Sequence, residues 1–482
     1  MITLILIFFP LLSALALFPV KGKNIKILAL AFSIIEFILC LVAAFQFENN
    51  AMPQFMVDVP WIVSLGINFK AGIDGISMLL LLLTTFLVPL IILSSFQNEY
   101  KNPKLFYALI LFMQSGLMGV FTALDGFLFY IFWEMALIPI YFICLLWGGQ
   151  ERIRITFKFF IYTLLGSLLM LVALTYLYLQ TPGKHTFDLL AFYSLHLDRT
   201  TQGWIFWALF IAFAVKMPVF PFHTWQPDTY TDAPPQGTML LSGIMLKMGI
   251  YGLVRLLMPI APLGLQDWGY IAIILSIIGI VYASCIAFVQ KDVKRLIAYS
   301  SIAHVGLISA GVLTFTLQGL QGGMLQMFSH GVNVVGLFFI IDIIQKRTNT
   351  RTITDLGGIR LSAPLLASFF MVIMLGSIGL PLTNGFIGEF LLFTGIFQYN
   401  PIFAAISGLT IILGAVYMLK AYQNTMLGEK NRITAIFPDL VLSEKLVLIP
   451  IVIMIFWFGI YPKPFLQMTE PTIKNLITII GK

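Results

Sequence analysis

Four charged residues lie inside long apolar segments of the sequence: Glu134, Lys216, Lys247 and Glu389. An ionised side chain near the centre of a lipid bilayer costs about 2.5–3.5 kcal/mol on insertion scales, so each of them needs a specific role. Glutamate and lysine exchange protons, and a change in the distance between Glu134 and Lys216 would change the proton affinity of the lysine. These residues therefore indicate proton loading and release within a membrane, whereas packing around a proline kink is the structural alternative for Lys216.

Three histidines lie in the same kind of segment: His223, His304 and His330. His223 follows Lys216 by seven residues, about two helical turns, so both side chains face one side if the helix continues. The polar neighbours of the other two histidines at helical spacing are Ser300, Ser301, Gln326 and Asn333. Histidines that titrate near neutrality beside hydroxyl and amide groups suit a proton relay. A haem held by His304 and His330 as axial ligands is a minor alternative. A metal ion is disfavoured, because no further ligands accompany the histidines.

The composition places these residues in a membrane protein. The chain has 482 residues, of which 59% are apolar and 10% are charged, and its mean hydropathy is +0.96. A soluble domain has about 45–50% apolar and about 25% charged residues, so this chain cannot cover a water-facing surface. Cys40, Cys144 and Cys285 are isolated, which predicts neither a disulfide framework nor an iron–sulfur cluster. The net charge of +7 comes without an aromatic-interleaved basic patch, so no nucleic-acid partner is expected.

Apolar segments of about 20 residues predict membrane-spanning helices, and about fourteen of them can be placed along the chain. The spans that contain the charged residues and the histidines are predicted at 125–147, 203–225, 234–258, 293–315, 319–345 and 362–398. Lysine and arginine concentrate in alternate loops, which by the positive-inside rule places both termini outside. Long side chains near span ends reach the interface, so four further charged residues are interpreted as structural. These four are Glu36, Arg255, Asp342 and Lys420.

Two of the predicted spans are interrupted. Pro218 and Pro221 break the first of them, and Gly379 and Pro381 break the second. Interrupted helices at corresponding places in two halves are typical of inverted-repeat transporters. We therefore predict an all-α polytopic membrane protein with two inverted five-helix repeats, each containing a broken helix. The predicted divisions are helices 1–3 (1–105), a first repeat of helices 4–8 (106–258), a second repeat of helices 9–13 (259–426), and helix 14 with a tail (427–482).

Five long segments of the chain resemble, in the same order, the signature segments of the antiporter-like subunits of respiratory complex I, the proton-pumping NADH:quinone oxidoreductase. The five segments are FYIFWEMALIPIYF, FAVKMPVFPFHTWQPD, DAPPQGTMLLSGIMLKMGIYG, KRLIAYSSIAHVG and GLPLTNGFIGEF. The resemblance covers roughly residues 70–425. Glu389 stands where the L and N types of this family are expected to carry lysine, so the chain is most similar to the M type.

The resemblance implies roles for the residues and partners for the chain. By this resemblance, Glu134 and Lys216 form the family's ion pair, Lys247 is its central lysine, His304 and His330 are its bridging residues, and Glu389 ends the channel. It also implies that the chain carries no redox cofactor, and that FMN, iron–sulfur clusters and quinone belong to partner subunits. The expected partners are L-type and N-type membrane subunits and, through the complex, the peripheral redox arm. The expected location is the inner membrane of a bacterium, with both termini in the periplasm.

Three alternatives stay open at this point. The first is a subunit of an Mrp-type sodium/proton antiporter, and the second is a subunit of a hydrogenase-linked proton pump, since both are similar to this family in fold. The third is a passive scaffold that completes a membrane complex without carrying protons. The charges inside the predicted spans favour proton transport over a scaffold.

Overall fold

The computed structural model describes residues 1–22 and 24–480. The N-terminal part comprises α1 (Ile2–Ala16), α2 (Asn24–Gln46), β1 (Gln54–Ile62), β2 (Ile67–Ile73), α3 (Gly75–Ser94) and α4 (Pro103–Thr122). It is followed by α5 (Gly126–Trp147), α6 (Arg152–Gln180), α7 (Leu189–Tyr193), α8 (Arg199–Lys216), α9 (Gln226–Asp232), α10 (Pro235–Leu240), α11 (Lys247–Gly252) and α12 (Met258–Ile260). The remaining helices are α13 (Pro262–Val289), α14 (Val293–Leu313), α15 (Leu317–Thr348), α16 (Pro364–Ile378), α17 (Asn384–Tyr399), α18 (Pro401–Met426), α19 (Leu442–Ile460) and α20 (Lys463–Ile480).

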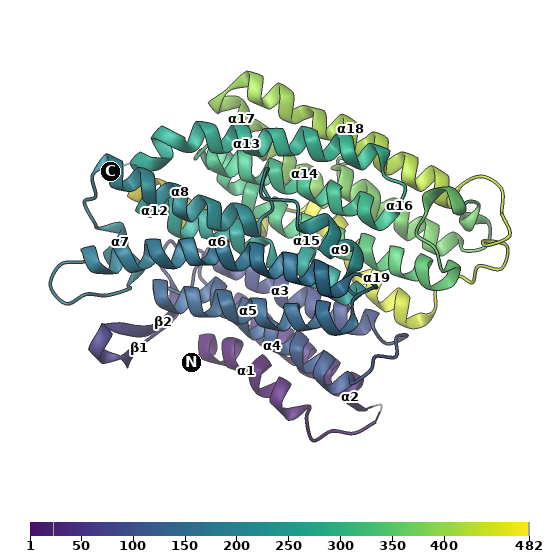
Figure 1. Cartoon of the computed structure of the whole chain (residues 1–482), viewed down its shortest axis with the longest axis horizontal. Coiled ribbons are helices and arrows are strands. Elements are labelled where there is room, and N and C mark those ends of the chain that lie inside the picture. The colour runs from purple at the N-terminus through teal and green to yellow at the C-terminus, as the bar shows by residue number, and fades with distance from the viewer. Residues whose placement is uncertain (23, 481–482) are drawn as a thin grey trace.

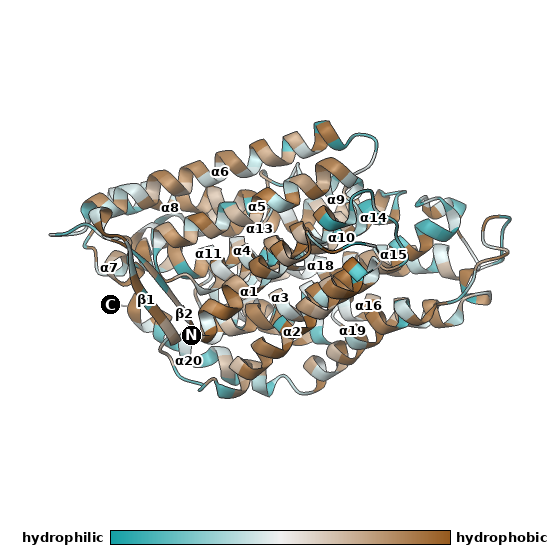
Figure 2. Ribbon diagram, turned by 90° about the horizontal axis from the view of Figure 1, so that it is seen from below, coloured by the Kyte–Doolittle hydropathy of each residue, from teal (hydrophilic) through white to brown (hydrophobic). Residues whose placement is uncertain are grey.

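The helices form one bundle whose long members run side by side (Figure 1). Within the described residues, eleven helices are long and apolar enough to cross a membrane, and α1 and α16 are shorter apolar helices. Hydrophobic residues dominate the helices, while hydrophilic residues gather in the loops at the two ends of the bundle (Figure 2). A helix lies in each of the six predicted ranges that contain the candidate residues. The predicted class is therefore confirmed, whereas the number of crossings and the repeat symmetry stay predictions.

Aspartates in the loops fix the starts of several helices. Asp74 accepts a hydrogen bond from Ser77 N at 3.0 Å at the start of α3. Asp125 accepts from two backbone N–H groups at 2.9 and 3.0 Å at the start of α5, and Asp292 accepts from Lys294 N at 2.8 Å at the start of α14. Such N-caps satisfy backbone donors that have no partner within the helix and stabilise it by about 1 kcal/mol each.

A short β-hairpin interrupts the all-helical pattern before α3. Strands β1 and β2 pair antiparallel, with Val59 opposite Phe69, and a left-handed glycine, Gly66, lies between them. Sequence analysis assigned no strand to this segment. The hairpin, the short helix α7 and both ends of the described chain lie at one end of the bundle in Figure 1. The two ends of the described chain thus lie at the same end of the bundle, which we call the hairpin side, and the side of the membrane on which they lie stays a prediction.

The first predicted break occurs directly after Lys216, where α8 ends. Residues 217–225 form turns rather than helix, and α9 begins only at Gln226. Trp225 Nε1 donates to Val215 O at 2.9 Å, and this hydrogen bond holds the end of the segment against the end of α8. The helix therefore does not continue from Lys216 to His223, so the two side chains do not share a helical face.

The second predicted break separates α16 from α17. Gly379 follows α16 with φ +78°, a left-handed conformation that only glycine adopts without strain. Leu380 N then donates to Leu375 O at 3.1 Å and closes the end of the helix. Both interruptions are thus confirmed, and each has a candidate residue beside it.

The final helix, α20, was not expected, because its residues lie in the predicted tail. It packs against α3, α12 and α15. Thr472 Oγ1 accepts a hydrogen bond from Gly75 N at 3.1 Å, and a Cβ atom on Gly75 would lie 1.8 Å from Met468 O. A helix near the end of the sequence therefore covers the start of α3, which has a backbone with no room for a side chain at Gly75.

Candidate functional site

Lys247 lies at the centre of the bundle, on a helix that departs from α-helical geometry on both sides of it. Two π-helical segments, Leu241–Met245 and Leu253–Leu257, flank α11. Leu246 N bonds to Leu241 O, five residues earlier, instead of to Ser242 O. The Lys247 ammonium group, which is fully buried, donates to Ser242 O at 2.5 Å. Segments of π-helix within α-helices occur frequently at functional sites.

His330 is the next member of a polar row that begins at Lys247. Lys247 Nζ lies 2.9 Å from His330 Nδ1, which joins α11 to α15. The rings of His330 and His304 have centroids 5.9 Å apart, which continues the row onto α14. His304 Nδ1 lies 3.3 Å from Glu389 Oε1 on α17. Four of the candidate residues, from four different helices, therefore form one continuous row in space.

Glu389 is held at the second break. Gln326 Nε2 donates to Glu389 Oε1 at 3.2 Å. A Cβ atom on Gly379 would lie 2.4 Å from Glu389 Oε2, so the carboxylate occupies the space that a side chain at Gly379 would fill. The glycine at the break thus gives the carboxylate room beside the end of α16.

The same break is fastened to α15 by amides. Asn333 Nδ2 donates to Asn384 Oδ1 at 3.0 Å, and Ser329 Oγ donates to Asn384 O at 2.8 Å. These contacts place the start of α17 against the helix that carries His330. Asn333 was predicted from the sequence to be a polar neighbour of His330, whereas no role was predicted for Ser329 or Asn384. Their spacing gave no signal, because the two segments that meet are 55 residues apart.

Lys216 and Glu134 are near each other but not in direct contact. Glu134 is close enough to interact electrostatically with the Lys216 ammonium group, yet the described residues contain no ion pair between them within 4.0 Å. Lys216 Nζ instead lies 5.2 Å from the centroid of the Trp133 ring. Lys216 is buried and Glu134 is half-buried. Lys216 Nζ and Glu134 Oε1 have no hydrogen-bond partner among the described residues.

Helices α8 and α11, which carry Lys216 and Lys247, pack closely against each other. A Cβ atom on Gly249 would lie 2.8 Å from Phe213 O, and one on Gly252 would overlap the Phe213 ring. Helices α8 and α11 therefore approach each other through these glycines. Lys216, at the end of α8, and Lys247, at the start of α11, are on facing helices, and no hydrogen bond joins them within the described part of the chain.

His223 lies apart from the row of polar contacts. It is buried in the segment after α8, its ring stacks on Phe220 with centroids 5.7 Å apart, and Tyr282 meets it edge-on at 5.2 Å. Its Nδ1 atom has no hydrogen-bond partner in residues 1–22 and 24–480. The structure thus does not bring His223 into contact with any of the other candidate residues.

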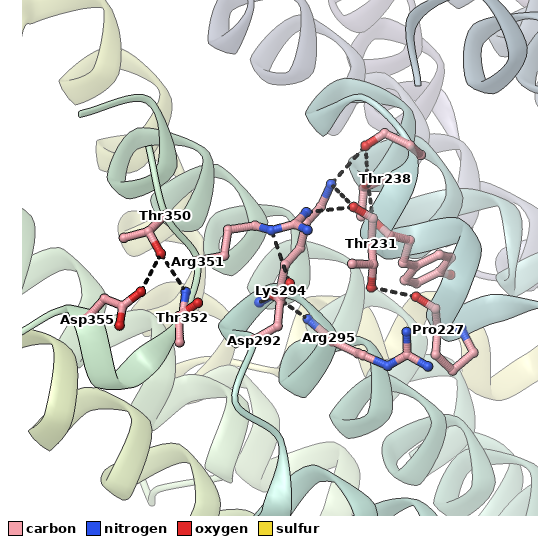
Figure 3. A network of polar contacts seen from close by, with 12 residues as sticks. Pro227, Thr231, Thr238, Asp292, Lys294, Arg295, Thr350, Arg351, Thr352 and Asp355 are labelled. Carbon is pink, nitrogen blue, oxygen red and sulfur yellow. Dashed lines mark hydrogen bonds and ion pairs between the residues drawn. The ribbon is translucent and has the colours of Figure 1, made fainter. Parts of the chain in front are cut away.

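The end of the bundle opposite the hairpin carries a polar network that fixes the start of the helix containing Lys247 (Figure 3). Lys294 Nζ donates to Ala233 O at 2.8 Å, and Arg351 Nη1 donates to Thr231 O at 2.8 Å. Arg351 also pairs with Asp292 at 3.1 Å. A cavity of about 880 Å³ is lined in part by Thr231, Lys294 and Arg351. The hydrogen bonds from Lys294 and Arg351, with the Arg351–Asp292 ion pair, thus connect the junction of α9 and α10 to the start of α14.

Glu36 differs from its interpretation as a side chain near a span end. It lies in the middle of α2 and is 1% exposed. Neither of its carboxylate oxygens has a hydrogen-bond partner among the residues that the structure describes. Hydropathy predicted the approximate ends of this span. The burial of Glu36 could not be predicted in the same way, because it depends on which neighbouring helices cover the side chain.

Comparisons with known proteins identify the family. Residues 123–414 match the family described as NADH:quinone oxidoreductase/Mrp antiporter, TM. The chain is 42% identical to the NADH-quinone oxidoreductase subunit M of Rickettsia typhi, with 98% of each chain covered. It is 39% identical to the F(420)H(2) dehydrogenase subunit M of Methanosarcina mazei, with 96% of this chain and 95% of that chain covered.

A solved structure supports the same family assignment. A chain of respiratory complex I from Thermus thermophilus with bound NADH is 29% identical and has a TM-score of 0.93, with both chains covered completely. Within the described residues, no group of three or more histidine, cysteine, aspartate or glutamate side chains is placed to hold a metal ion. The chain therefore belongs to the NADH:quinone oxidoreductase/Mrp antiporter family of membrane proteins, as an antiporter-like subunit of the M type.

Proposed function

We propose that this chain is the proton-translocating M-type membrane subunit of an NADH:quinone oxidoreductase. Protons move along an axis of Glu134, Lys216, Lys247, His330, His304 and Glu389, driven by quinone reduction elsewhere in the complex. The observation that carries the proposal is the row of contacts from Lys247 through His330 and His304 to Glu389. His223 was predicted to take part, and we assign it no step because it contacts none of the others.

The energetics favour a transport role for these residues over a stabilising one. Burying a charge has a desolvation cost that its partner rarely recovers, so apolar side chains of similar size are often as stable or more so. A row of titratable side chains that reaches across four helices therefore needs a function that apolar residues cannot supply. Groups that hold and release protons close to one another supply such a function.

Partners and location are part of the same proposal. The chain sits beside L-type and N-type subunits in the inner membrane of a bacterium, with both termini on the periplasmic side. FMN, iron–sulfur clusters and quinone are bound by partner subunits rather than by this chain. The region 106–258 forms one antiporter-like repeat and 259–426 forms its inverted counterpart, while 1–105 and 427–482 flank them.

Replacement of Lys216 by methionine tests the proposal. Methionine has a similar length and no proton to exchange, so we expect proton uptake into inverted membrane vesicles to fall about tenfold, the effect of an added barrier of about 1.4 kcal/mol. The rate is measured with NADH as electron donor and normalised to the amount of assembled complex. Lys420→Met is the matched control, since Lys420 is also in a long apolar helix but is exposed. Undiminished pumping in the Lys216 variant would contradict the axis.

The rival in which the chain serves an Mrp-type sodium/proton antiporter makes a different prediction. It requires sodium-dependent growth loss when the chain is deleted, while NADH:quinone oxidoreduction continues. Our proposal requires the reverse, because deletion removes part of the membrane arm of the oxidoreductase. Co-purification after gentle detergent extraction separates the two: flavin and iron–sulfur subunits support our proposal, and a set of small antiporter chains overturns it.

Replacement of Gly379 by alanine is expected to disturb Glu389 without altering its chemistry. The new Cβ atom would collide with Glu389 Oε2, and the left-handed backbone costs a side chain about 1–2 kcal/mol. We expect pumping to fall about threefold and the thermal stability of the complex to decrease. Gly408→Ala is the control, because nothing lies within 4 Å of its added Cβ atom. Equal behaviour of the two variants would show that the position of Glu389 is not critical.

A further inference from the structure

A second set of polar side chains begins one helical turn from Lys247, towards the hairpin side. Tyr251 and Arg255 follow Lys247 by four and eight residues along one helix, so the three positions lie close to one face. Tyr251 is fully buried, and its ring packs edge-on against Phe121 with centroids 5.4 Å apart. The proposed axis from Lys247 to Glu389 uses neither Tyr251 nor Arg255.

The Tyr251 hydroxyl is the centre of three contacts. It donates to Phe121 O at 3.0 Å and lies 3.3 Å from Ser77 Oγ. Arg255 Nε donates to the same hydroxyl at 3.2 Å. The hydroxyl is therefore linked both to the start of α3 and to the arginine further along its own helix.

Arg255 and Asp74 form the next link. Arg255 Nη2 lies 2.5 Å from Asp74 Oδ2, and it also donates to Ser77 Oγ at 3.3 Å. The side chain of Arg255 is 12% exposed and that of Asp74 is 2% exposed, so water screens this ion pair little. Tyr193 donates to Arg255 O at 2.6 Å and ties this part of the helix to α7. An arginine interpreted from sequence as reaching the interface is instead paired inside the protein.

A cavity of about 200 Å³ lies beyond this pair, on the hairpin side. Asp74 and Arg255 line it together with Lys70 and Asp188, which form a second ion pair at 2.5 Å. Residues of β2, α7 and α20 complete the wall, and these elements lie at the end of the bundle where both termini are found (Figure 1). The polar side chains thus form a series from one turn beyond Lys247 to a cavity at one end of the molecule.

We propose that Tyr251, Ser77 and the Arg255–Asp74 pair form a proton outlet from Lys247 to the hairpin-side cavity. The inference rests on the proposed function. The Lys247 ammonium group, which donates to Ser242 O five residues before it, turns towards Tyr251 and releases its proton through water to the Tyr251 hydroxyl, which passes a proton on through the Ser77 hydroxyl. The Asp74 carboxylate accepts that proton and passes it to water in the cavity, which leaves Lys247 neutral and Asp74 charged again.

Arg255 is a positioning residue in this outlet rather than a carrier. Its guanidinium group does not lose a proton in proteins, so it cannot relay one. It orients the Asp74 carboxylate, and its fixed positive charge opposes the entry of protons and other cations from the cavity. The fixed charge therefore keeps other cations out of the outlet, while the driving reaction elsewhere in the complex sets the direction of proton flow.

Two conservative variants test the outlet. Tyr251→Phe keeps the ring and its packing but removes the hydroxyl, and Asp74→Asn keeps a side-chain acceptor for Ser77 N but removes the titratable group. We expect each to reduce NADH-driven proton uptake into inverted vesicles about threefold or more, with a larger solvent deuterium isotope effect. Asp267→Asn is the matched control, because Asp267 pairs with Arg199 on the same side of the bundle and is not part of the series.

The outcomes separate the outlet from the proposed function. Normal pumping by Tyr251→Phe and Asp74→Asn, together with loss of pumping by Lys247→Met, would overturn the outlet alone. Normal pumping by Lys247→Met would overturn the proposed function. If Asp74→Asn prevents assembly, Tyr251→Phe decides by itself, since that variant disturbs no packing: wild-type pumping and an unchanged isotope effect would then exclude the outlet.

Discussion

Replacing Lys247 with methionine is expected to abolish most NADH-driven proton pumping, with a decrease of about tenfold or more, while the complex still assembles. The functional loss follows from its place in the site. Lys247 is the residue that contacts His330, and the proposed outlet begins one turn from it. A methionine at this position interrupts both the path from Lys247 to Glu389 and the proposed outlet from Lys247 to Asp74.

Assembly should survive this change for a physical reason. A lysine at the centre of a membrane span costs about 2.5–3.5 kcal/mol on insertion scales, whereas methionine is apolar and fits a similar volume. Two groups lose their lysine partner, His330 Nδ1 and Ser242 O, and each lost hydrogen bond offsets about 1 kcal/mol of that gain. The variant complex is therefore expected to be at least as stable as the native one.

The measurement compares proton uptake with the quantity of intact complex in the same vesicles. Lys291→Met serves as the control, since Lys291 is an exposed loop residue before α14. Pumping at the native rate in the Lys247 variant would refute a central role for this residue. Loss of the assembled complex would refute the argument that its charge is retained for transport at a cost in stability.

Three substitutions of Glu389 are expected to differ from one another. Glu389→Ala should reduce pumping about tenfold, because it removes the titratable group and the acceptor for Gln326. Glu389→Gln keeps the shape and a side-chain acceptor for Gln326 but cannot exchange a proton at this step. Glu389→Lys restores a titratable group beside the break and should retain more pumping than either of the others.

The three variants also separate transport from stability. Truncation to alanine leaves the buried amide of Gln326 without its partner, at a cost of about 1–3 kcal/mol, whereas glutamine avoids that cost. We therefore expect the melting temperature of the complex to be lowered by Glu389→Ala and little changed by Glu389→Gln. Proton uptake and thermal unfolding of the purified complex measure the two effects. Equal pumping by the lysine and alanine variants would contradict a need for proton exchange at this position.

Much of the architecture could be predicted from the sequence, because a membrane span is a local property. Length and hydropathy located the helices that carry His304, His330 and Glu389, and proline and glycine located both breaks. The search for membrane spans missed the β-hairpin, because its strands of nine and seven residues are much shorter than a span of about 20 residues. It also missed α20, whose mixed apolar and polar residues resemble a tail rather than a span.

The site could be predicted as a set of residues but not as a geometry. Charges in apolar segments identified Lys216, Lys247 and Glu389, since a charged residue within an apolar segment can be recognised from the sequence alone. Contacts between segments that are far apart in the chain cannot be recognised from the sequence alone. Arg255 and Asp74 are 181 residues apart, so the arginine was interpreted by its distance from a span end. The proposed outlet was therefore missed.

The position of α20 has a consequence for the biosynthesis of the protein. A chain made from its N-terminus inserts α3 early, but the cover over the start of that helix, from Met468 to Thr472, is translated after all of the other described helices. Until then, the backbone at Gly75 and the neighbouring Asp74 face an incomplete wall. A chain that stops before α20 would therefore insert the other described helices and leave the start of α3 uncovered.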